Sequence, residues 1–197
     1  MPSLMIHLKV GYEIGKKINK NSYDYYLGLI APDTPNLNGF AEKNKRWSAH
    51  IREDDLYKWR QSLKVFYQKN EKNYEKDFII GYYIHVLIDI IFDEFLYFKI
   101  KKKILKDNYK NEEVHTVMSN DMYNYYFFEF PLIREILKSS DKSYSINELK
   151  KEDILKWKEK NINRSFNNRS KYINSLEIEE LVNRVYDELK DEKKDSC

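Results

Sequence analysis

Cysteine, proline and glycine are scarce in this 197-residue chain, and its positive and negative charges nearly cancel. The single cysteine is the last residue, Cys197, so no intramolecular disulfide, cysteine-based zinc site or CxxC redox pair can form. The 35 Lys and Arg against 32 Asp and Glu give a net charge of +3. Dedicated nucleic-acid-binding domains are usually strongly basic, so we expect no specific binding of nucleic acid.

Apolar and aromatic side chains are plentiful. Hydrophobic residues make up 42% of the chain and aromatic residues 15%, with 17 Tyr and 10 Phe. Disordered chains combine low hydrophobicity with high net charge, so this composition predicts a folded protein. A chain of this length usually closes one hydrophobic core, and we therefore expect a single domain over residues 1–197.

One apolar run, residues 78–98, is long enough to cross a bilayer. It also contains His85, Asp89, Asp93 and Glu94, and an Asp near the bilayer centre costs about 2.5–3.5 kcal/mol. We therefore predict a buried helix of a soluble protein and no transmembrane segment. The N-terminal residues lack a charged start followed by an apolar core and a cleavage site, which predicts a cytoplasmic location.

Apolar residues recur at helical spacing through most of the chain, and no strand-like alternation between hairpin turns is present. The sequence therefore predicts an all-α, compact multi-helix domain with a central helix buried on nearly every face. Pro32, Pro35 and Gly39 fall together in one expected loop, and a helix over 113–137 is expected to bend before Pro131. The expected segments are helices at 4–18, 22–30, 54–70, 78–104, 113–137, 146–160 and 175–192, and loops at 31–40 and 161–170.

The most informative feature is a histidine and an aspartate inside the most apolar helix. His85 and Asp89 are four residues apart, so they lie on one helical face, which Asp93 extends. An unpaired buried carboxylate costs several kcal/mol, and something must neutralise it. A divalent metal ion would do so, and so would a metal-free His–Asp hydrogen bond. The spacing alone leaves both interpretations open.

Three further residues favour the metal. His7 lies among apolar residues of the first helix, Asp33 follows Pro32 in the expected loop, and His50 begins an expected helix in RWSAHIR. With His85 and Asp89 they supply three imidazoles and two carboxylates. Zinc prefers such nitrogen and oxygen ligands, and iron or manganese accept them less specifically.

The order of these pieces resembles the zinc-dependent phospholipase C family, which includes secreted bacterial phospholipases and is related to zinc single-strand nucleases. The resemblance rests on MPSLMIH, then LGLIAPD, then AHI, then GYYIHVLID, all within residues 1–104. It implies an all-helical fold with metal in a cleft between helices. It further implies a central zinc site, and a neighbouring site at His7 that Asp89 could bridge. The implied central ligands are Asp33, His50, His85 and Asp89.

The chain departs from this family pattern at three places. Family members often carry a histidine after HxxxD, where this chain has Asp93, and then a His-xxx-Glu pair, where it has His115 followed by Ser119. Asp121 could substitute for the missing glutamate, and the chain begins with Met-Pro where secreted members present an aromatic residue. We therefore expect one or two metal ions rather than three.

The expected function follows from the metal. Zinc lowers the pKa of bound water toward about 7, and paired metal ions can hold a phosphate. The sequence thus predicts a metal-dependent, phospholipase C-like hydrolase that acts on a small phosphoester, with a lipid among the candidate substrates and Asp33 as a base or water-orienting ligand. Two alternatives stay open at this point: a non-catalytic metal-binding module of the same fold, and a buried polar network without metal.

Overall fold

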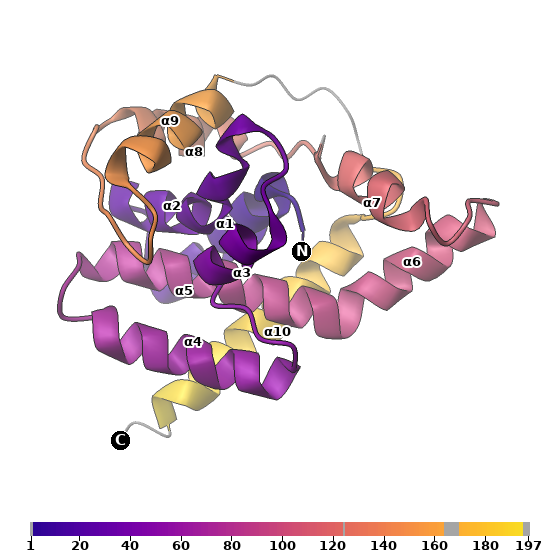
Figure 1. The fold of residues 1–197 in the computed structure, drawn as a ribbon, viewed down its shortest axis with the longest axis horizontal. Coiled ribbons are helices and arrows are strands. Elements are labelled where there is room, and N and C mark those ends of the chain that lie inside the picture. Colours follow the sequence, from indigo (N-terminus) through magenta and orange to yellow (C-terminus); the bar gives the residue numbers. More distant parts are fainter. Residues whose placement is uncertain (1, 124, 164–169, 195–197) are drawn as a thin grey trace.

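The computed structural model describes residues 2–123, 125–163 and 170–194, and within them the chain is all-α, as predicted (Figure 1). The described residues include an isolated antiparallel bridge between Ile146 and Leu149. The elements in chain order are α1 (Leu4–Ile18), α2 (Tyr23–Ile30), the 3₁₀ helix η1 (Ala31–Asn38), α3 (Lys43–Ala49), α4 (Leu56–Asn70), α5 (Lys76–Ile91), the π-helical turn η2 (Phe92–Leu96), α6 (Tyr97–Lys106), α7 (Val114–Tyr123), α8 (Phe130–Lys138), α9 (Lys151–Ile162) and α10 (Ser175–Lys194).

Helix α5 is the centre of the packing, as the apolar run predicted. From Phe78 to Ile91 every residue except Ile80 is buried, including the two polar residues His85 and Asp89. Helices α1, α2, α4 and α10 pack against α5 and cover it from different sides (Figure 1). Any polar group on α5 therefore has to find its partners inside the protein.

The predicted uninterrupted helix over 78–104 is wrong beyond Ile91. The chain passes through the π-helical turn Phe92–Leu96 and continues as α6 in a new direction (Figure 1). Of the residues in α6, only Ile100 and Ile104 are buried. Past Phe92 the apolar residues follow one stripe, so this part is amphipathic and lies at the surface. Single π-helical turns inside α-helices occur frequently at functional sites.

Helices α2 and α5 cross with their backbones in contact. A methyl group added at Gly28 would lie 2.1 Å from the Phe78 carbonyl oxygen, and one added at Gly81 would lie 2.1 Å from the Tyr25 carbonyl oxygen. Since no side chain fits at either position, glycine is required on both helices. This crossing brings the C-terminal end of α2, and the 3₁₀ helix that follows it, onto the middle of α5.

Two expected segments differ in the structure. Residues 31–40 are predicted as a loop, but Ala31–Asn38 form the 3₁₀ helix η1. Pro32 stands in the first turn of η1, where a missing backbone N–H group costs no hydrogen bond. The single bent helix predicted over 113–137 is two helices, α7 and α8. Pro131 lies in the first turn of α8 and disfavours helical geometry in the residue before it.

The predicted helix over 146–160 begins later than expected, at Lys151. Asn147 and Glu148 adopt positive φ angles of 46° and 67° inside the bridge between Ile146 and Leu149, which makes a tight turn before α9. Helix α10 covers the last predicted helix. Most of the predicted loop over 161–170, at 164–169, and Cys197 lie outside the described residues.

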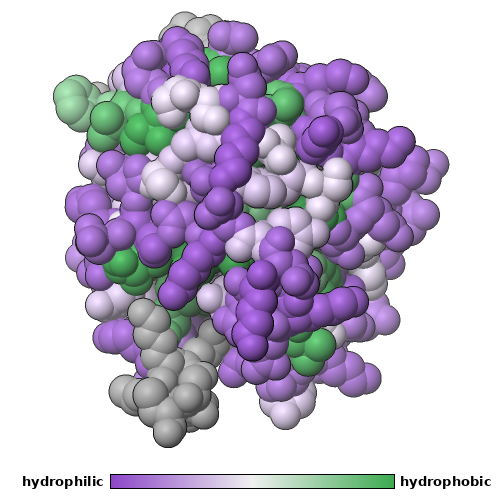
Figure 2. All heavy atoms as spheres, turned by 90° about the vertical axis from the view of Figure 1, so that its left-hand side faces the viewer, coloured by the Kyte–Doolittle hydropathy of each residue, from purple (hydrophilic) through white to green (hydrophobic). Residues whose placement is uncertain are grey.

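The surface is mostly hydrophilic where Figure 2 shows it, with small separate apolar patches. Isolated apolar residues on a surface are normal in soluble proteins. Among the described residues, no helix has both the length and the apolar character needed to cross a membrane. Helix α5, whose sequence is the most apolar in the chain, has only 16 residues.

Helix α10 begins with a reciprocal cap. The Asn174 side chain accepts a hydrogen bond from the Leu176 backbone N–H at 2.9 Å, and Glu177 accepts one from the Asn174 backbone N–H at 3.0 Å. Glu177 also accepts a hydrogen bond from Lys103 of α6 at 2.6 Å, and its side chain is only 5% exposed. One carboxylate therefore caps α10 and ties it to α6.

We predict that Gly81→Ala destabilises the fold by about 2–3 kcal/mol, because the new methyl group would overlap backbone that cannot move aside. Urea unfolding followed by circular dichroism measures the change. Gly11→Ala is the matched control: its methyl group would meet only the side chain of Leu29, which can adjust. Equal stability of Gly81→Ala and the wild type would show that the helices do not need this close approach.

We also predict that Glu177→Gln destabilises the protein in a pH-dependent way. Burial raises the pKa of Glu177, but the hydrogen bonds from Lys103 and Asn174 outweigh it and hold the pKa below the ordinary 4.5. The stabilisation is therefore complete above pH 4.5 and is lost as the pH falls through the folded-state pKa. We expect a loss of about 1–2 kcal/mol at pH 7 and almost none at pH 3, measured by urea unfolding.

Candidate metal centre

Five polar side chains from four elements meet inside the helical core. His7 comes from α1, Asp33 from η1, His50 from the residue after α3, and His85 and Asp89 from α5. Asp33 is 8% exposed and the other four are 0% exposed. The structure thus brings together all five residues singled out in the sequence. It corrects one detail: His50 ends α3 at its C-cap rather than beginning a helix.

Each of the three histidines is oriented in the same way. Nδ1 of His7 lies 3.0 Å from the Ser3 carbonyl oxygen, that of His50 lies 2.8 Å from the Arg46 carbonyl oxygen, and that of His85 lies 2.7 Å from the Leu29 carbonyl oxygen. A carbonyl oxygen only accepts hydrogen bonds, so every Nδ1 carries the proton. The lone pair of each neutral ring is therefore on Nε2.

The three Nε2 atoms face the two carboxylates. His7 Nε2 lies 3.4 Å from Asp89 Oδ1, while His50 Nε2 and His85 Nε2 lie 3.5 and 3.7 Å from Asp89 Oδ2. His50 Nε2 is also 3.5 Å from Asp33 Oδ1 and 3.2 Å from His85 Nε2. The His7 and His85 rings stack in parallel, with their centroids 3.7 Å apart.

These separations fit a metal ion. Zinc–ligand bonds of about 2.0–2.1 Å in a tetrahedral site place the ligand atoms about 3.3 Å from one another. Two sets of ligand atoms lie close enough together to hold an ion: His7, His85 and Asp89, and Asp33, His50 and His85. Histidine ligands of metals commonly donate their other ring N–H to a backbone carbonyl, as all three do here.

Several polar atoms of the cluster have no hydrogen bond. Among the described residues, His7 Nε2 and both carboxylate oxygens of Asp89 are buried without a partner. A fully buried carboxylate without hydrogen bonds is costly, because it has lost its water and gained nothing in return. Direct coordination to metal ions would satisfy these atoms. The metal-free His–Asp hydrogen bond considered from the sequence does not do so, since His85 Nε2 is 3.7 Å from Asp89.

The protonation states also suit a cation. Burial and the neighbouring His7 lower the pKa of His85 to about 3, so its ring is neutral at pH 7. Burial acts to raise the pKa of Asp89, but the nearby histidines outweigh it and hold that pKa far below the ordinary value. Burial acts to lower the pKa of His50, but Asp33 and Asp89 outweigh it and raise that pKa, so a cation would bind His50 in competition with a proton. With all three imidazoles neutral, the five residues would carry two negative charges, which match one divalent ion.

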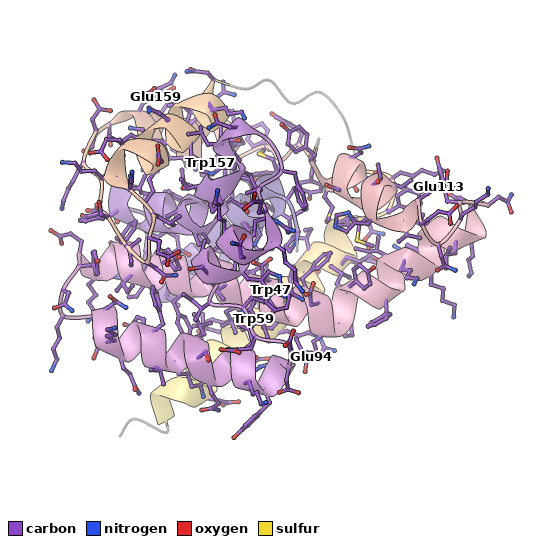
Figure 3. The ribbon with its side chains drawn as sticks, viewed as in Figure 1. Trp47, Trp59, Glu94, Glu113, Trp157 and Glu159 are labelled. Atoms are coloured by element: carbon purple, nitrogen blue, oxygen red, sulfur yellow. The ribbon has the colours of Figure 1, made fainter. Side chains whose placement is uncertain are left out.

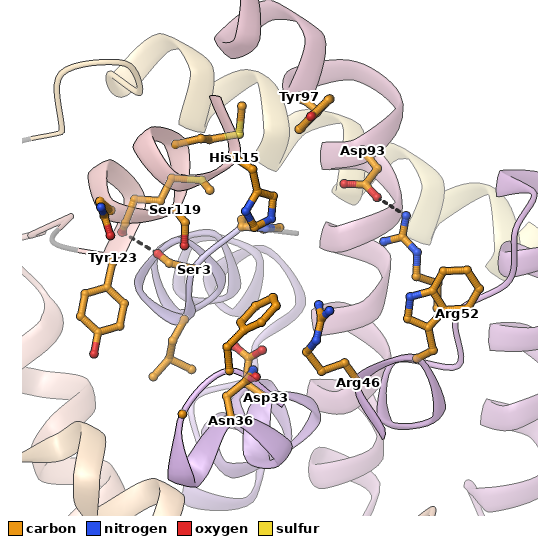
Figure 4. A pocket seen from close by; sticks show the side chains of 18 of the residues that line it. Ser3, Asp33, Asn36, Arg46, Arg52, Asp93, Tyr97, His115, Ser119 and Tyr123 are labelled. Carbon is orange, nitrogen blue, oxygen red and sulfur yellow. Dashed lines mark hydrogen bonds and ion pairs between the residues drawn. The ribbon is translucent and has the colours of Figure 1, made fainter. Parts of the chain in front are cut away.

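Asp33 connects the cluster to a pocket of about 800 Å³. Of the five cluster residues it alone lines this pocket, together with residues of η1, α3, the π-helical turn, α6 and α7 (Figure 4). Burial acts to raise the pKa of Asp33, but His50 and His85 outweigh burial and hold the pKa below its ordinary value. The carboxylate is therefore ionised at neutral pH. A molecule in the pocket would therefore meet the cluster at Asp33.

The pocket wall opposite Asp33 is cationic and aromatic. The Arg52 guanidinium lies 4.5 Å from the Trp59 ring centroid and 5.6 Å from that of Trp47 (Figure 3), and it pairs with Asp93 at 2.8 Å. The Arg46 guanidinium lies 3.9 Å from the Phe40 ring centroid. Both arginines reach into the pocket (Figure 4).

The residues considered for a further metal site do not join the cluster. Asp93 pairs with Arg52, and Asp121 accepts hydrogen bonds from the backbone N–H groups of Lys171 and Tyr172. His115 lines the pocket beside Phe40. None of these three residues belongs to a group that could hold a metal ion within the described part of the chain.

Sequence reasoning missed the groups that surround the five residues. The carbonyl oxygens of Ser3, Leu29 and Arg46, which fix the histidine rings, leave no mark in the sequence because every residue has one. Arg46 did leave a signal: it precedes His50 by four residues, so both lie on one side of α3.

Comparison with known proteins assigns a family to the whole chain. No curated protein and no solved structure matches the sequence. A family model described as zinc dependent phospholipase C matches residues 4–196, nearly the entire sequence. The match extends far beyond the motifs in residues 1–104, and it agrees with the all-α fold and with a buried histidine–aspartate cluster that could hold a metal ion. The chain therefore belongs to the zinc-dependent phospholipase C family.

Proposed function

We propose that the protein is a zinc-dependent hydrolase that cleaves a phosphoester in the pocket beside Asp33. The observation that carries this proposal is the arrangement of three Nε2 lone pairs and two ionised carboxylates around one buried point that opens to a cavity. A purely structural polar network would not need three imidazoles with unprotonated nitrogens facing one another. Family membership supports the same chemistry.

The ligands divide unequally between two positions. His50 Nε2, His85 Nε2 and Asp89 Oδ2 lie 3.2–3.7 Å from one another, a set sufficient for one ion, and Asp33 Oδ1 lies 3.5 Å from His50 Nε2. His7 and Asp89 Oδ1 offer only two atoms on the other side of the same carboxylate. His85 cannot serve both positions, because its Nδ1 is bonded to Leu29. We therefore propose one firmly held ion, and a second whose protein ligands are incomplete.

Asp33 is our candidate for the residue that orients the attacking water. Zinc bound in the cluster would supply Lewis acidity and activate water at neutral pH. Asp33 is ionised, contacts the pocket and lies 3.5 Å from His50, so its carboxylate can accept a hydrogen bond from a water molecule and take its proton. Catalytic zinc sites usually have three protein ligands and one open position, and His50, His85 and Asp89 are those three.

The pocket suits a substrate with one anionic end and one apolar part. The anionic end would lie near Asp33 and Arg46, and the apolar part along hydrophobic walls. A small phosphoester has this character, and a phospholipid is the form that the family suggests. The hydrophobic residues of the lining include Leu4, Phe40, Phe98, Met118, Met122 and Tyr123.

We predict that His85→Ala removes the bound metal. Loss of even outer partners of metal ligands weakens metal affinity about 10–100-fold, so loss of a ligand should reduce the zinc content at least ten-fold. Elemental analysis of dialysed protein measures this content. His115→Ala is the matched control, because His115 lines the same pocket outside the cluster. Wild-type protein with less than about a tenth of an equivalent of zinc, iron or manganese would refute the metal site.

We predict that Asp33→Asn lowers the rate of phosphoester hydrolysis by about 20-fold or more while zinc stays bound, because an amide cannot take a proton from water. The assay uses a panel of generic phosphoesters. Asp54→Asn removes a charge from the exposed rim of the pocket and serves as the control. Unchanged turnover in Asp33→Asn would remove Asp33 from the mechanism, and zinc-loaded wild type without turnover would favour a metal-binding module.

A further inference from the structure

The charged side chain of Arg46 lines the pocket next to the metal cluster. Arg46 is half-buried, and its guanidinium reaches into the pocket on the side facing Asp33 (Figure 4). Its Nε donates a hydrogen bond to the Ala41 carbonyl oxygen at 3.0 Å, and its plane lies over the Phe40 ring at 3.9 Å. These two contacts hold the guanidinium in place and leave its terminal NH₂ groups for a ligand.

Three of the carboxylates that line the pocket have partners other than Arg46. Asp93 pairs with Arg52 at 2.8 Å, Glu53 accepts a hydrogen bond from Ser62, and Asp33 faces His50. Among the described residues, no carboxylate lies within ion-pair distance of Arg46. Arg52 is thus largely neutralised by its partner, whereas the positive charge of Arg46 is not.

The surroundings of Arg46 disfavour its charge. Arg46 is half-buried and has Arg52, a second positive charge, as a neighbour. An arginine remains protonated in proteins even so, which means that the guanidinium keeps its charge at a cost. A bound anion would relieve this cost. A planar guanidinium group binds two phosphate oxygens through two parallel hydrogen bonds. Such charge-assisted pairs are among the strong hydrogen bonds in proteins.

We infer that Arg46 is the anion clamp of the pocket: it binds the non-bridging oxygens of a tetrahedral phosphate group placed between it and the metal cluster. The inference rests on the proposed function, which identifies the anion as a phosphate. It adds a positively charged side chain, which the metal ligands do not supply. The phosphate belongs either to a lipid headgroup or to a soluble compound, and both present the same oxygens to Arg46.

The effect of Arg46 on phosphate can be separated from any effect on metal. His50 is oriented by the backbone carbonyl oxygen of Arg46, which every substitution at this position retains. A change in the side chain therefore leaves the ligand set intact. Lys45, the preceding residue, is exposed and does not line the pocket, so Lys45→Gln removes one positive charge from the same helix as a matched control.

The test is calorimetric titration of inorganic phosphate into dialysed, zinc-loaded protein, with zinc content and far-UV circular dichroism measured for every variant. We expect Arg46→Gln to weaken phosphate binding by about 10–100-fold, the range for hydrogen bonds to a charged group, with zinc content unchanged. Arg46→Lys keeps the positive charge but loses the planar guanidinium that makes two parallel hydrogen bonds. Its affinity for phosphate should therefore lie between those of Arg46→Gln and the wild type. Lys45→Gln should bind phosphate as the wild type does.

Three results would overturn the inference: no phosphate binding by the zinc-loaded wild type, wild-type affinity in Arg46→Gln, or loss of zinc from both Arg46 variants. The last would make Arg46 a structural support of the cluster. Failure of the proposed function gives a different result, namely phosphate binding that depends on Arg46 without hydrolysis of any phosphoester.

A second measurement identifies the source of the phosphate. Sedimentation with phosphatidylcholine vesicles that contain or lack phosphatidic acid shows whether the clamp binds a phosphate on a lipid surface. Binding to either kind of vesicle that needs Arg46, and that inorganic phosphate competes away, supports a lipid headgroup, because both lipids carry a phosphate group. Binding of inorganic phosphate that depends on Arg46, without vesicle binding, supports a soluble phosphoester.

Discussion

The close crossing of α2 and α5 is the constraint on which the site depends. Glycines at positions 28 and 81 allow the two backbones to touch, and this contact places the Leu29 carbonyl oxygen 2.7 Å from Nδ1 of His85. The same crossing sets where α2 ends, and thus where η1 carries Asp33. A side chain at either glycine would separate the helices, and His85 would lose both its orientation by Leu29 and its position beside Asp33.

Burial gives the cluster its chemical character. In water, His85 and Asp89 would be an ordinary base and acid, but inside α5 they are surrounded by hydrocarbon and by one another. Burial keeps the His85 ring neutral, and the neighbouring histidines keep Asp89 ionised. Neutral imidazoles and anionic carboxylates are the states in which these groups bind zinc. Only Asp33 reaches the pocket, so the rest of the cluster is shielded from solvent.

The two arginines of the pocket differ in whether a carboxylate balances their charge. Arg52 is matched by Asp93 and held against two tryptophans, whereas Arg46 faces the cavity without a carboxylate. The negative charge of Asp33, at the edge of the cluster, and the positive charge of Arg46 therefore both face this pocket (Figure 4). An arrangement of this kind orients an anionic group, because metal and guanidinium would attract its oxygens from two sides.

Sequence patterns determined the helical class, the buried central helix and the five polar residues, because periodicity and a charge inside an apolar run are local properties. They did not determine where helices end: the π-helical turn at 92–96, the 3₁₀ helix at 31–38 and the break before Pro131 depend on competing local geometries of similar energy. Only the tertiary structure placed the backbone carbonyl oxygens behind the histidines and Arg46 opposite Asp33. Those contacts join residues as far apart as Leu29 and His85, and no spacing along the chain encodes the distance between them.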